Sequence, residues 1–255
     1  MDTPRVRMFA GPNGSGKSTL NTILNENLLG IYINADEIEK EIKKFDFLDL
    51  SSYDISTTTE VIHSFFIHHP LIQKADLEEE ARLLTVTDNK ISFYEISVNS
   101  YFASVCADFI RHRLLDLKVS FTFETVMSSE DKVEFLKKAQ DAGYRTYLYF
   151  VTTQDPAINI SRVKNRVKLG GHNVPEEKIT SRYYRSMKLL SKAIKYTDRA
   201  YMFDNSSHTK IWIAQIDNTS EITYKSSQVP QWFSQYLLDV NKVNKMNYKK
   251  LFVSK

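Results

Sequence analysis

The residues from Gly11 to Ser18 read Gly-Pro-Asn-Gly-Ser-Gly-Lys-Ser and match the pattern G-x-x-x-x-G-K-[ST] of a phosphate-binding P-loop completely. Glycines let such a loop curl so that successive N–H groups face phosphate oxygens. Lys17 is expected to reach the β- and γ-phosphates of a nucleoside triphosphate, and the Ser18 hydroxyl to ligate Mg²⁺. The expected nucleotide-binding residues of this segment are Gly11, Pro12, Asn13, Gly14, Ser15, Gly16, Lys17, Ser18 and Thr19.

Polar residues that follow two further apolar runs are the next candidates. Asp36 follows one run, and Glu124 and Thr125 follow another. Ligands of α/β proteins bind outside the carboxyl ends of the parallel strands, so these residues are expected at the sheet edge that carries the P-loop. Asp36 can take a proton from an acceptor hydroxyl or position Mg²⁺, which we favour, or it can cap a helix over 37–44. For Glu124 and Thr125, a substrate contact competes with capping of the strand end.

Four arginines lie on two neighbouring predicted helices. Arg162 and Arg166 are four residues apart and share one helix face, and Arg182 and Arg185 lie beyond a Gly-Gly break. Phosphoryl transfer needs cations on the moving group, and a mobile helical lid is a usual way to supply them. A solvated basic face that binds nothing is the alternative reading.

The elements that must position these residues alternate between strands and helices. Such alternation predicts an α/β fold with a mainly parallel sheet flanked by helices and joined by right-handed crossovers. The predicted strands are 5–10, 30–34, 119–123, 145–152 and 200–203, with a hairpin over 210–225. The predicted helices are 18–27, 37–44, one from about 100 to 114, one from Ser128 or Ser129 to Gly143, 156–169, 175–196 and one from Pro230.

The region 45–99 interrupts this regular pattern. It suggests helices over about 57–67 and 75–85 and a hairpin over 83–96, and its three histidines show no carboxylate partner pattern. We therefore expect an insertion without a metal site. The whole chain, 1–255, is predicted to be a single P-loop kinase-like domain with this insertion, a lid at about 156–197, and a C-terminal hairpin and helix at about 208–255.

The composition of the chain limits the classes of protein to which it can belong. The chain has 255 residues, of which 42% are hydrophobic and 25% charged, the balance of an ordinary globular protein. A net charge of +3 does not require a nucleic-acid partner. The single cysteine, Cys106, excludes an internal disulfide and reads as a core residue. No leader pattern and no apolar run of roughly 18 residues is present, so we expect a cytoplasmic protein with no membrane partner.

The P-loop alone does not separate kinases from other P-loop proteins. A GTPase would need an N-K-x-D motif at a suitable place, and a motor ATPase usually shows an apolar strand ending in Asp-Glu. The sequence shows neither, so phosphoryl transfer to a small molecule remains.

Several segments together resemble the zeta-toxin-like P-loop kinases, in particular the branch described as predicted ABC-type ATPases. The most distinctive of these segments, more so than the P-loop, runs from Arg162 through Gly170-Gly171 and Pro175 to Ser186. In order along the chain, the similar segments are GPNGSGKST (11–19), YINADEI (32–38), FTFETVMSS (121–129), RVKNRVKLGGHNVPEEKITSRYYRS (162–186) and MFDNSS (202–207).

This resemblance implies ATP- and Mg²⁺-dependent phosphorylation of a hydroxyl on a nucleotide-activated sugar such as UDP-N-acetylglucosamine, in a toxin neutralised by an antitoxin partner. The implied roles are a catalytic base for Asp36, ATP and Mg²⁺ binding for Lys17 and Ser18, a substrate contact for Glu124 and Thr125, phosphate clamping for Arg166 and Arg182, and ATP binding for Arg162 and Asn205.

Other readings stay open from the sequence. The acceptor could be another nucleotide or a dinucleotide, because the acceptor pocket does not transfer with the motifs. The protein could also be an ATP-binding switch in which catalysis is incidental, or a kinase of nucleic-acid ends, although no interleaved aromatic platform supports a nucleic-acid partner. The sequence leaves the oligomeric state and toxicity undecided.

Overall fold

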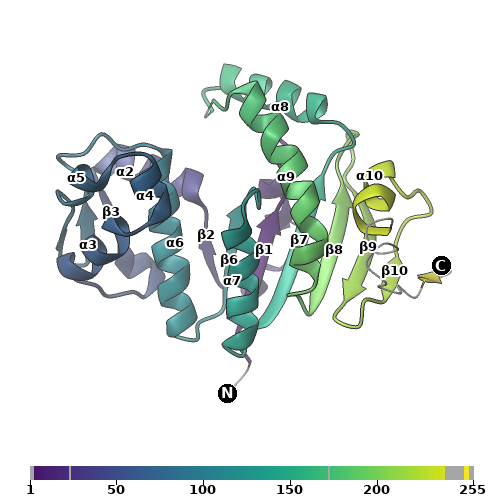
Figure 1. Cartoon of the computed structure of the whole chain (residues 1–255), viewed down its shortest axis with the longest axis horizontal. Coiled ribbons are helices and arrows are strands. Elements are labelled where there is room, and N and C mark those ends of the chain that lie inside the picture. Colours follow the sequence, from purple (N-terminus) through teal and green to yellow (C-terminus); the bar gives the residue numbers. More distant parts are fainter. Residues whose placement is uncertain (1–2, 23, 172, 239–249, 253–255) are drawn as a thin grey trace. The chain divides into compact units, whose positions relative to one another are not determined.

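The computed structural model describes residues 3–22, 24–171, 173–238 and 250–252. The chain divides into two compact units, of which the first comprises Met1–Gly30 with Glu124–Lys255 and the second Ile31–Phe123. Figure 1 shows strands and helices alternating along the chain, so the predicted α/β class with a mainly parallel sheet is confirmed.

The sheet of the first unit has the strand order β11-β10-β9-β8-β7-β1. β7 pairs in parallel with β1 and with β8, whereas β9 runs antiparallel to β8 and to β10. The predicted strands and the hairpin that turns after Asp217 are therefore confirmed. The strands are β1 (Arg5–Ala10), β7 (Arg145–Thr152), β8 (Arg199–Asp204), β9 (Ile211–Asp217), β10 (Ile222–Tyr224) and β11 (Lys250–Phe252).

Helices α7 and α9 lie over one face of this sheet (Figure 1). The Thr152 hydroxyl of β7 contacts the sulfur of Met187 on α9 at 3.5 Å, and Met187 is fully buried. Asp155 caps α8, the helix predicted over 156–169, because its carboxylate accepts from the Ala157 N–H at 2.7 Å. The helices are α7 (Glu130–Asp141), α8 (Pro156–Lys168), α9 (Glu176–Ile194), α10 (Gln231–Phe233) and a π-turn over Ser234–Leu238.

The helix predicted over 18–27 is wrong. The chain forms a 3-10 helix over Lys17–Thr22 and a short α1 (Glu26–Leu29). The Thr19 and Thr22 hydroxyls donate to the Gly16 and Thr19 carbonyls, both at 2.8 Å. Such side-chain bonds to nearby backbone groups compete with the regular α-helical ladder.

The second unit is built around α6 (Ser100–Asp116), most of whose apolar residues are buried. Helix α2 (Ala35–Phe45) packs against it, and β2 (Ile31–Ile33) pairs in parallel with Phe121–Phe123 of β6 (Phe121–Thr125). Thus Glu124 and Thr125 are the last residues of a strand rather than the first residues beyond one.

The predicted insertion forms a small antiparallel sheet and short helices. Its sheet has the order β3-β5-β4, and β4 and β5 form the predicted hairpin. The helix predicted over 75–85 is wrong, because the segment holds only the short α5, which left-handed Asp76 (φ 52°) separates from α4. The elements are β3 (Phe47–Asp49), a 3-10 turn (Leu50–Tyr53), α3 (Thr59–Ile67), α4 (Pro70–Lys74), α5 (Glu78–Ala81), β4 (Thr85–Thr87) and β5 (Lys90–Ser92).

A buried charge cluster in this unit corrects one expectation. His69 does have a carboxylate partner, because its Nε2 lies 2.9 Å from the Asp108 carboxylate, which also pairs with Arg111 at 2.5 Å. His69 Nδ1 meanwhile accepts from the Leu71 N–H. Nδ1 thus caps α4, and Nε2 ties α4 to α6. Among the described residues no group of three or more His, Cys, Asp or Glu side chains is arranged to hold a metal ion.

Cys106 lies on α6 in the same unit and is fully buried, as predicted for a core residue. Burial raises the pKa of its thiol well above the ordinary value. Within the described part of the chain, no helix combines the length and the apolar character that crossing a membrane requires.

The C-terminal segment is fastened to the sheet through a buried hydrogen bond. Trp232 Nε1 donates to the Asp204 carboxylate at 2.7 Å, and the two residues are 2% and 4% exposed. We expect Trp232→Phe to lower the free energy of unfolding by about 1–3 kcal/mol, because it leaves a buried carboxylate oxygen without its donor. Urea unfolding followed by circular dichroism measures this. Trp212→Phe is the control, since Trp212 is 39% exposed; equal losses in the two variants would contradict the prediction.

Candidate active site

The P-loop continues directly from β1 and takes a backbone shape that only glycine supports at two positions. Gly14 and Gly16 have φ values of 75° and 91°, in the left-handed region. A β carbon at Gly14 would press on the Asn159 carbonyl, and one at Gly16 would collide with the side-chain amide of Asn205. The glycines therefore serve both the curl of the loop and the close approach of its neighbours.

Two asparagine side chains hold the loop from outside. Asn159 Nδ2 donates to the Asn13 carbonyl at 2.6 Å, and Asn205 Nδ2 donates to the Ser15 carbonyl at 2.8 Å. The C=O and N–H of a trans peptide point in opposite directions. Binding these carbonyls on one side therefore turns the N–H groups of the following residues to the other side, the arrangement of a phosphate nest.

Asn159 is the residue that sequence analysis missed. It is fully buried in α8, and its Oδ1 accepts from the Thr153 hydroxyl. A signal was present in the sequence, because Asn159 lies four residues before Val163, which is 2% exposed on the inner face of the same helix. A polar residue on a buried helix face needs a partner.

Lys17 and Ser18 of the P-loop both lie next to oxygen atoms. Lys17 Nζ donates to the Gly11 and Pro12 carbonyls at 2.9 and 3.1 Å. The Ser18 hydroxyl faces Glu124 Oε2 at 3.5 Å. The structure thus brings Glu124, expected to contact substrate, to the residue expected to bind Mg²⁺. Thr125 has a local contact as well, because its hydroxyl accepts from the Met127 N–H at 3.1 Å.

Two of the four arginines contact the P-loop or the segment that braces it. Arg182 Nη1 lies 3.4 Å from Asn13 Oδ1, and Arg162 Nη2 donates to the Ser207 carbonyl at 3.2 Å. Arg162 Nη1 is buried and has no hydrogen-bond partner. Arg166 and Arg185 are exposed on their helices. The four arginines therefore do not form one uniform basic face.

Asn205 directly follows β8, and both its backbone and its side chain form hydrogen bonds. Its N–H donates to the Thr152 carbonyl at 2.8 Å, which extends the β7–β8 pairing by one residue. The amide then binds Ser15, so the structure places Asn205 as a brace of the P-loop backbone.

Asp36 belongs to the second unit and lies in the first turn of α2. The alternative that Asp36 caps a helix over 37–44 is wrong, because the helix begins at Ala35 and Asn34 caps it. The Asn34 side chain accepts from the Asp36 N–H at 2.9 Å. The Asp36 carboxylate is exposed and is not needed as the cap.

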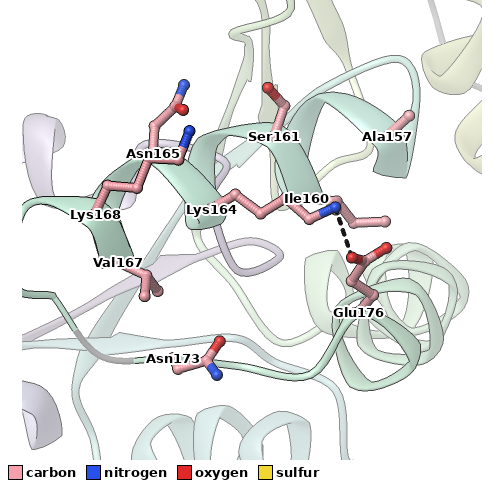
Figure 2. Close-up of a pocket in the computed structure, with 9 residues that line it drawn as sticks. All are labelled: Ala157, Ile160, Ser161, Lys164, Asn165, Val167, Lys168, Asn173 and Glu176. Atoms are coloured by element: carbon pink, nitrogen blue, oxygen red, sulfur yellow. Dashed lines mark ion pairs between the residues drawn. The ribbon is translucent and has the colours of Figure 1, made fainter.

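A hollow of about 660 Å³ lies against α8 and is separate from the predicted site residues, none of which lines it (Figure 2). Lys164 Nζ and Glu176 Oε1 form an ion pair across it at 2.7 Å. Its lining residues are Ala157, Ile160, Ser161, Lys164, Asn165, Val167, Lys168, Asn173 and Glu176.

The close approach at Gly16 gives a test with a matched control. Gly16→Ala and Gly143→Ala each place a side chain at a left-handed residue, with φ 91° and 83°, which costs roughly 1–2 kcal/mol of stability. Only at Gly16 does a β carbon meet Asn205; nothing lies within 4 Å of one at Gly143. We therefore expect Gly16→Ala to abolish nucleotide binding and Gly143→Ala to preserve it, as measured by calorimetry. Normal binding by Gly16→Ala would contradict this account of the loop.

A model of the Zeta toxin family matches residues 93–217. Two relatives cover more of the chain. An uncharacterized protein of Haemophilus influenzae is 22% identical over 175 residues, covering 69% of this chain and 89% of that protein. A cytidylate kinase of Clostridium botulinum is 24% identical over 210 residues, covering 78% of this chain and 89% of that enzyme.

Among solved structures, the AvrRxo1-ORF1:AvrRxo1-ORF2 complex with sulphate ions matches with a TM-score of 0.52 and 12% identity over 92% of this chain. The same complex with ATP matches with a TM-score of 0.50 and 13% identity over 99% of this chain. The chain spans 63% and 66% of those two structures' chains, less than two thirds of their length. At these identities the likeness shows the fold alone. None of these matches singles out the ABC-type ATPase branch, but residues 93–217 match the model of the Zeta toxin family, and the fold of the chain is similar to that seen in the AvrRxo1-ORF1:AvrRxo1-ORF2 complex.

Proposed function

We propose that this protein is an ATP-dependent kinase that transfers the γ-phosphate to a hydroxyl of a nucleotide-activated sugar such as UDP-N-acetylglucosamine. The observation that carries the proposal is the P-loop braced by two asparagines, with Lys17 within it and Arg182 against it. An ATP complex among the structures of the same fold supports the choice of nucleotide.

The residues present fit a nucleoside triphosphate. The loop combines left-handed glycines with braced carbonyls, and the Ser15 hydroxyl is buried without a hydrogen-bond partner. Lys17 donates to two neutral backbone carbonyls, and phosphate oxygens are stronger partners than these for an ammonium group. When bound, ATP supplies the phosphoryl group. The chain supplies the N–H nest, Lys17 and the arginines that neutralise charge.

The donor set at Ser18 also fits Mg²⁺. A hydroxyl and a carboxylate face each other at 3.5 Å, and Mg²⁺ commonly takes one or two carboxylates together with phosphate oxygens and water. Glu124 is therefore assigned to the metal as well as to the substrate contact implied by the family resemblance. Thr125 is retained as a substrate contact within the proposal.

Asp36 is proposed as the general base for the acceptor hydroxyl. The capping of α2 by Asn34 supports this role, because the exposed carboxylate of Asp36 is not used as the cap of the helix. Arg166 and Arg182 are proposed to clamp the transferred phosphate, and Arg162 to bind ATP. Of these three, Arg182 has the contact with the P-loop that supports its role.

The acceptor and the biological setting belong to the same proposal. The cytidylate kinase relative favours a nucleotide as an alternative acceptor, and an ATP-binding switch predicts binding without any phosphorylated product. A toxin role with an antitoxin partner is supported by the family name and by the second protein in the AvrRxo1 complexes.

The proposed base is tested by Asp36→Asn with Glu37→Gln as the control. Glu37 is a neighbouring exposed carboxylate that pairs with Lys40. We expect Asp36→Asn to lower phosphorylation of the acceptor roughly 10²–10⁴-fold while ATP still binds, because only the proton acceptor is lost. Mass spectrometry after incubation with Mg²⁺, ATP and sugar nucleotides, CMP, nucleosides and dinucleotides identifies the product. Absence of any product, or equal rates in the two variants, would count against the proposal.

The proposed metal ligand is tested by Glu124→Gln. We expect the Mg²⁺ concentration for half-maximal ATP turnover to rise roughly tenfold, because an amide oxygen is a weaker ligand than a carboxylate. Glu130→Gln is the matched control, since Glu130 pairs with Lys192 on the surface. If Glu124→Gln instead changes only the KM of the acceptor, Glu124 binds substrate and not the metal.

A further inference from the structure

Lys210 lies just before β9 and contacts the last residue of the P-loop segment, Thr19. Its Nζ lies 2.5 Å from the hydroxyl oxygen of Thr19, the residue that follows Ser18. The Thr19 hydroxyl donates its own proton to the Gly16 carbonyl at 2.8 Å. Its oxygen is therefore the acceptor for the ammonium, and Lys210 is positioned by the last residues of the loop.

The charge of Lys210 has no anionic partner among the residues that the structure describes. Burial lowers the pKa of its ammonium, and no neighbouring carboxylate opposes that effect. Other lysines of the chain behave differently: Lys192 pairs with Glu130 and Lys164 with Glu176. Removing a cation from water costs free energy, and a hydroxyl oxygen alone offsets that cost less well than an anion does.

We propose that Lys210 is a further polyphosphate-binding residue, which contacts the phosphates of the nucleotide at the Thr19 end of the P-loop. Arg182 contacts Asn13 near the start of the same loop. These two cations would then meet the phosphate chain from both ends of the loop, and Lys17 lies in sequence between the residues that they contact, Asn13 and Thr19. This inference rests on the nucleotide site of the proposed function, but it does not depend on which acceptor is phosphorylated.

The test compares Lys210→Met, which keeps the length without the charge, with Lys210→Arg, which keeps the charge. Lys225→Met is the matched control, since Lys225 lies over the ring of Trp212 and is exposed. Calorimetric titrations use Mg²⁺ with ATP, ADP, AMP and adenosine as the probes. Thermal unfolding of each protein without nucleotide is measured alongside.

We expect Lys210→Met to raise the Kd of ATP about tenfold, the usual effect of losing one charge-assisted hydrogen bond. The Kd of adenosine should stay unchanged, Lys210→Arg should retain most of the affinity, and Lys225→Met should match the parent protein. The Tm without nucleotide should not fall in Lys210→Met, because an unpaired, half-buried charge has been removed.

Unchanged ATP affinity in Lys210→Met overturns the inference. An equal loss of affinity for ATP and for adenosine, together with a lowered Tm, also overturns it, because Lys210 would then have a structural role only. A parent protein that binds ATP without phosphorylating any acceptor would overturn the proposed function and leave the role of Lys210 standing. A parent protein that binds no triphosphate would overturn both.

Discussion

Two side-chain amides, those of Asn159 and Asn205, hold the backbone on which the phosphate site depends. They reach the P-loop because the sheet brings their segments there: β7 pairs in parallel with both β1 and β8, and all three strands end at one edge. The Asn205 N–H extends that pairing to Thr152. The shape of the loop is therefore set by strand register as much as by its own glycines, and every proposed phosphate contact presupposes it.

The same bonds restrict how the segment predicted to be a lid can move. The first turns of α8 are tied to the loop through Asn159, and the Tyr183 hydroxyl of α9 donates to the Thr153 carbonyl at 2.6 Å. Helix α8 is thus anchored in its first turn and α9 at Tyr183. A rearrangement that brings Arg166 to a phosphate must occur beyond these anchors, where left-handed Gly170 separates the helices.

Features encoded locally were predictable, and features that depend on distant partners were not. The Asp155 cap, the strands and the hairpin at Asp217 follow from neighbouring residues. The prediction of a helix after the loop failed because the Thr19 and Thr22 side chains bond to nearby backbone groups, and helical periodicity does not reveal that competition. The pairing of His69 with Asp108 and the contact of Lys210 with Thr19 join residues 39 and 191 positions apart, so spacing alone could not reveal them.

The burial of Cys106 has a practical consequence for studying the motion of α8. A thiol that is fully enclosed and has a raised pKa presents almost no thiolate to a maleimide or nitroxide reagent in the native protein. Because Cys106 is the one cysteine of the chain, we expect the natural sequence to react hardly at all with such labels. Cysteines introduced on α8 and in the first unit's sheet would carry the only labels, so distances between α8 and the sheet could be followed without first removing a core side chain.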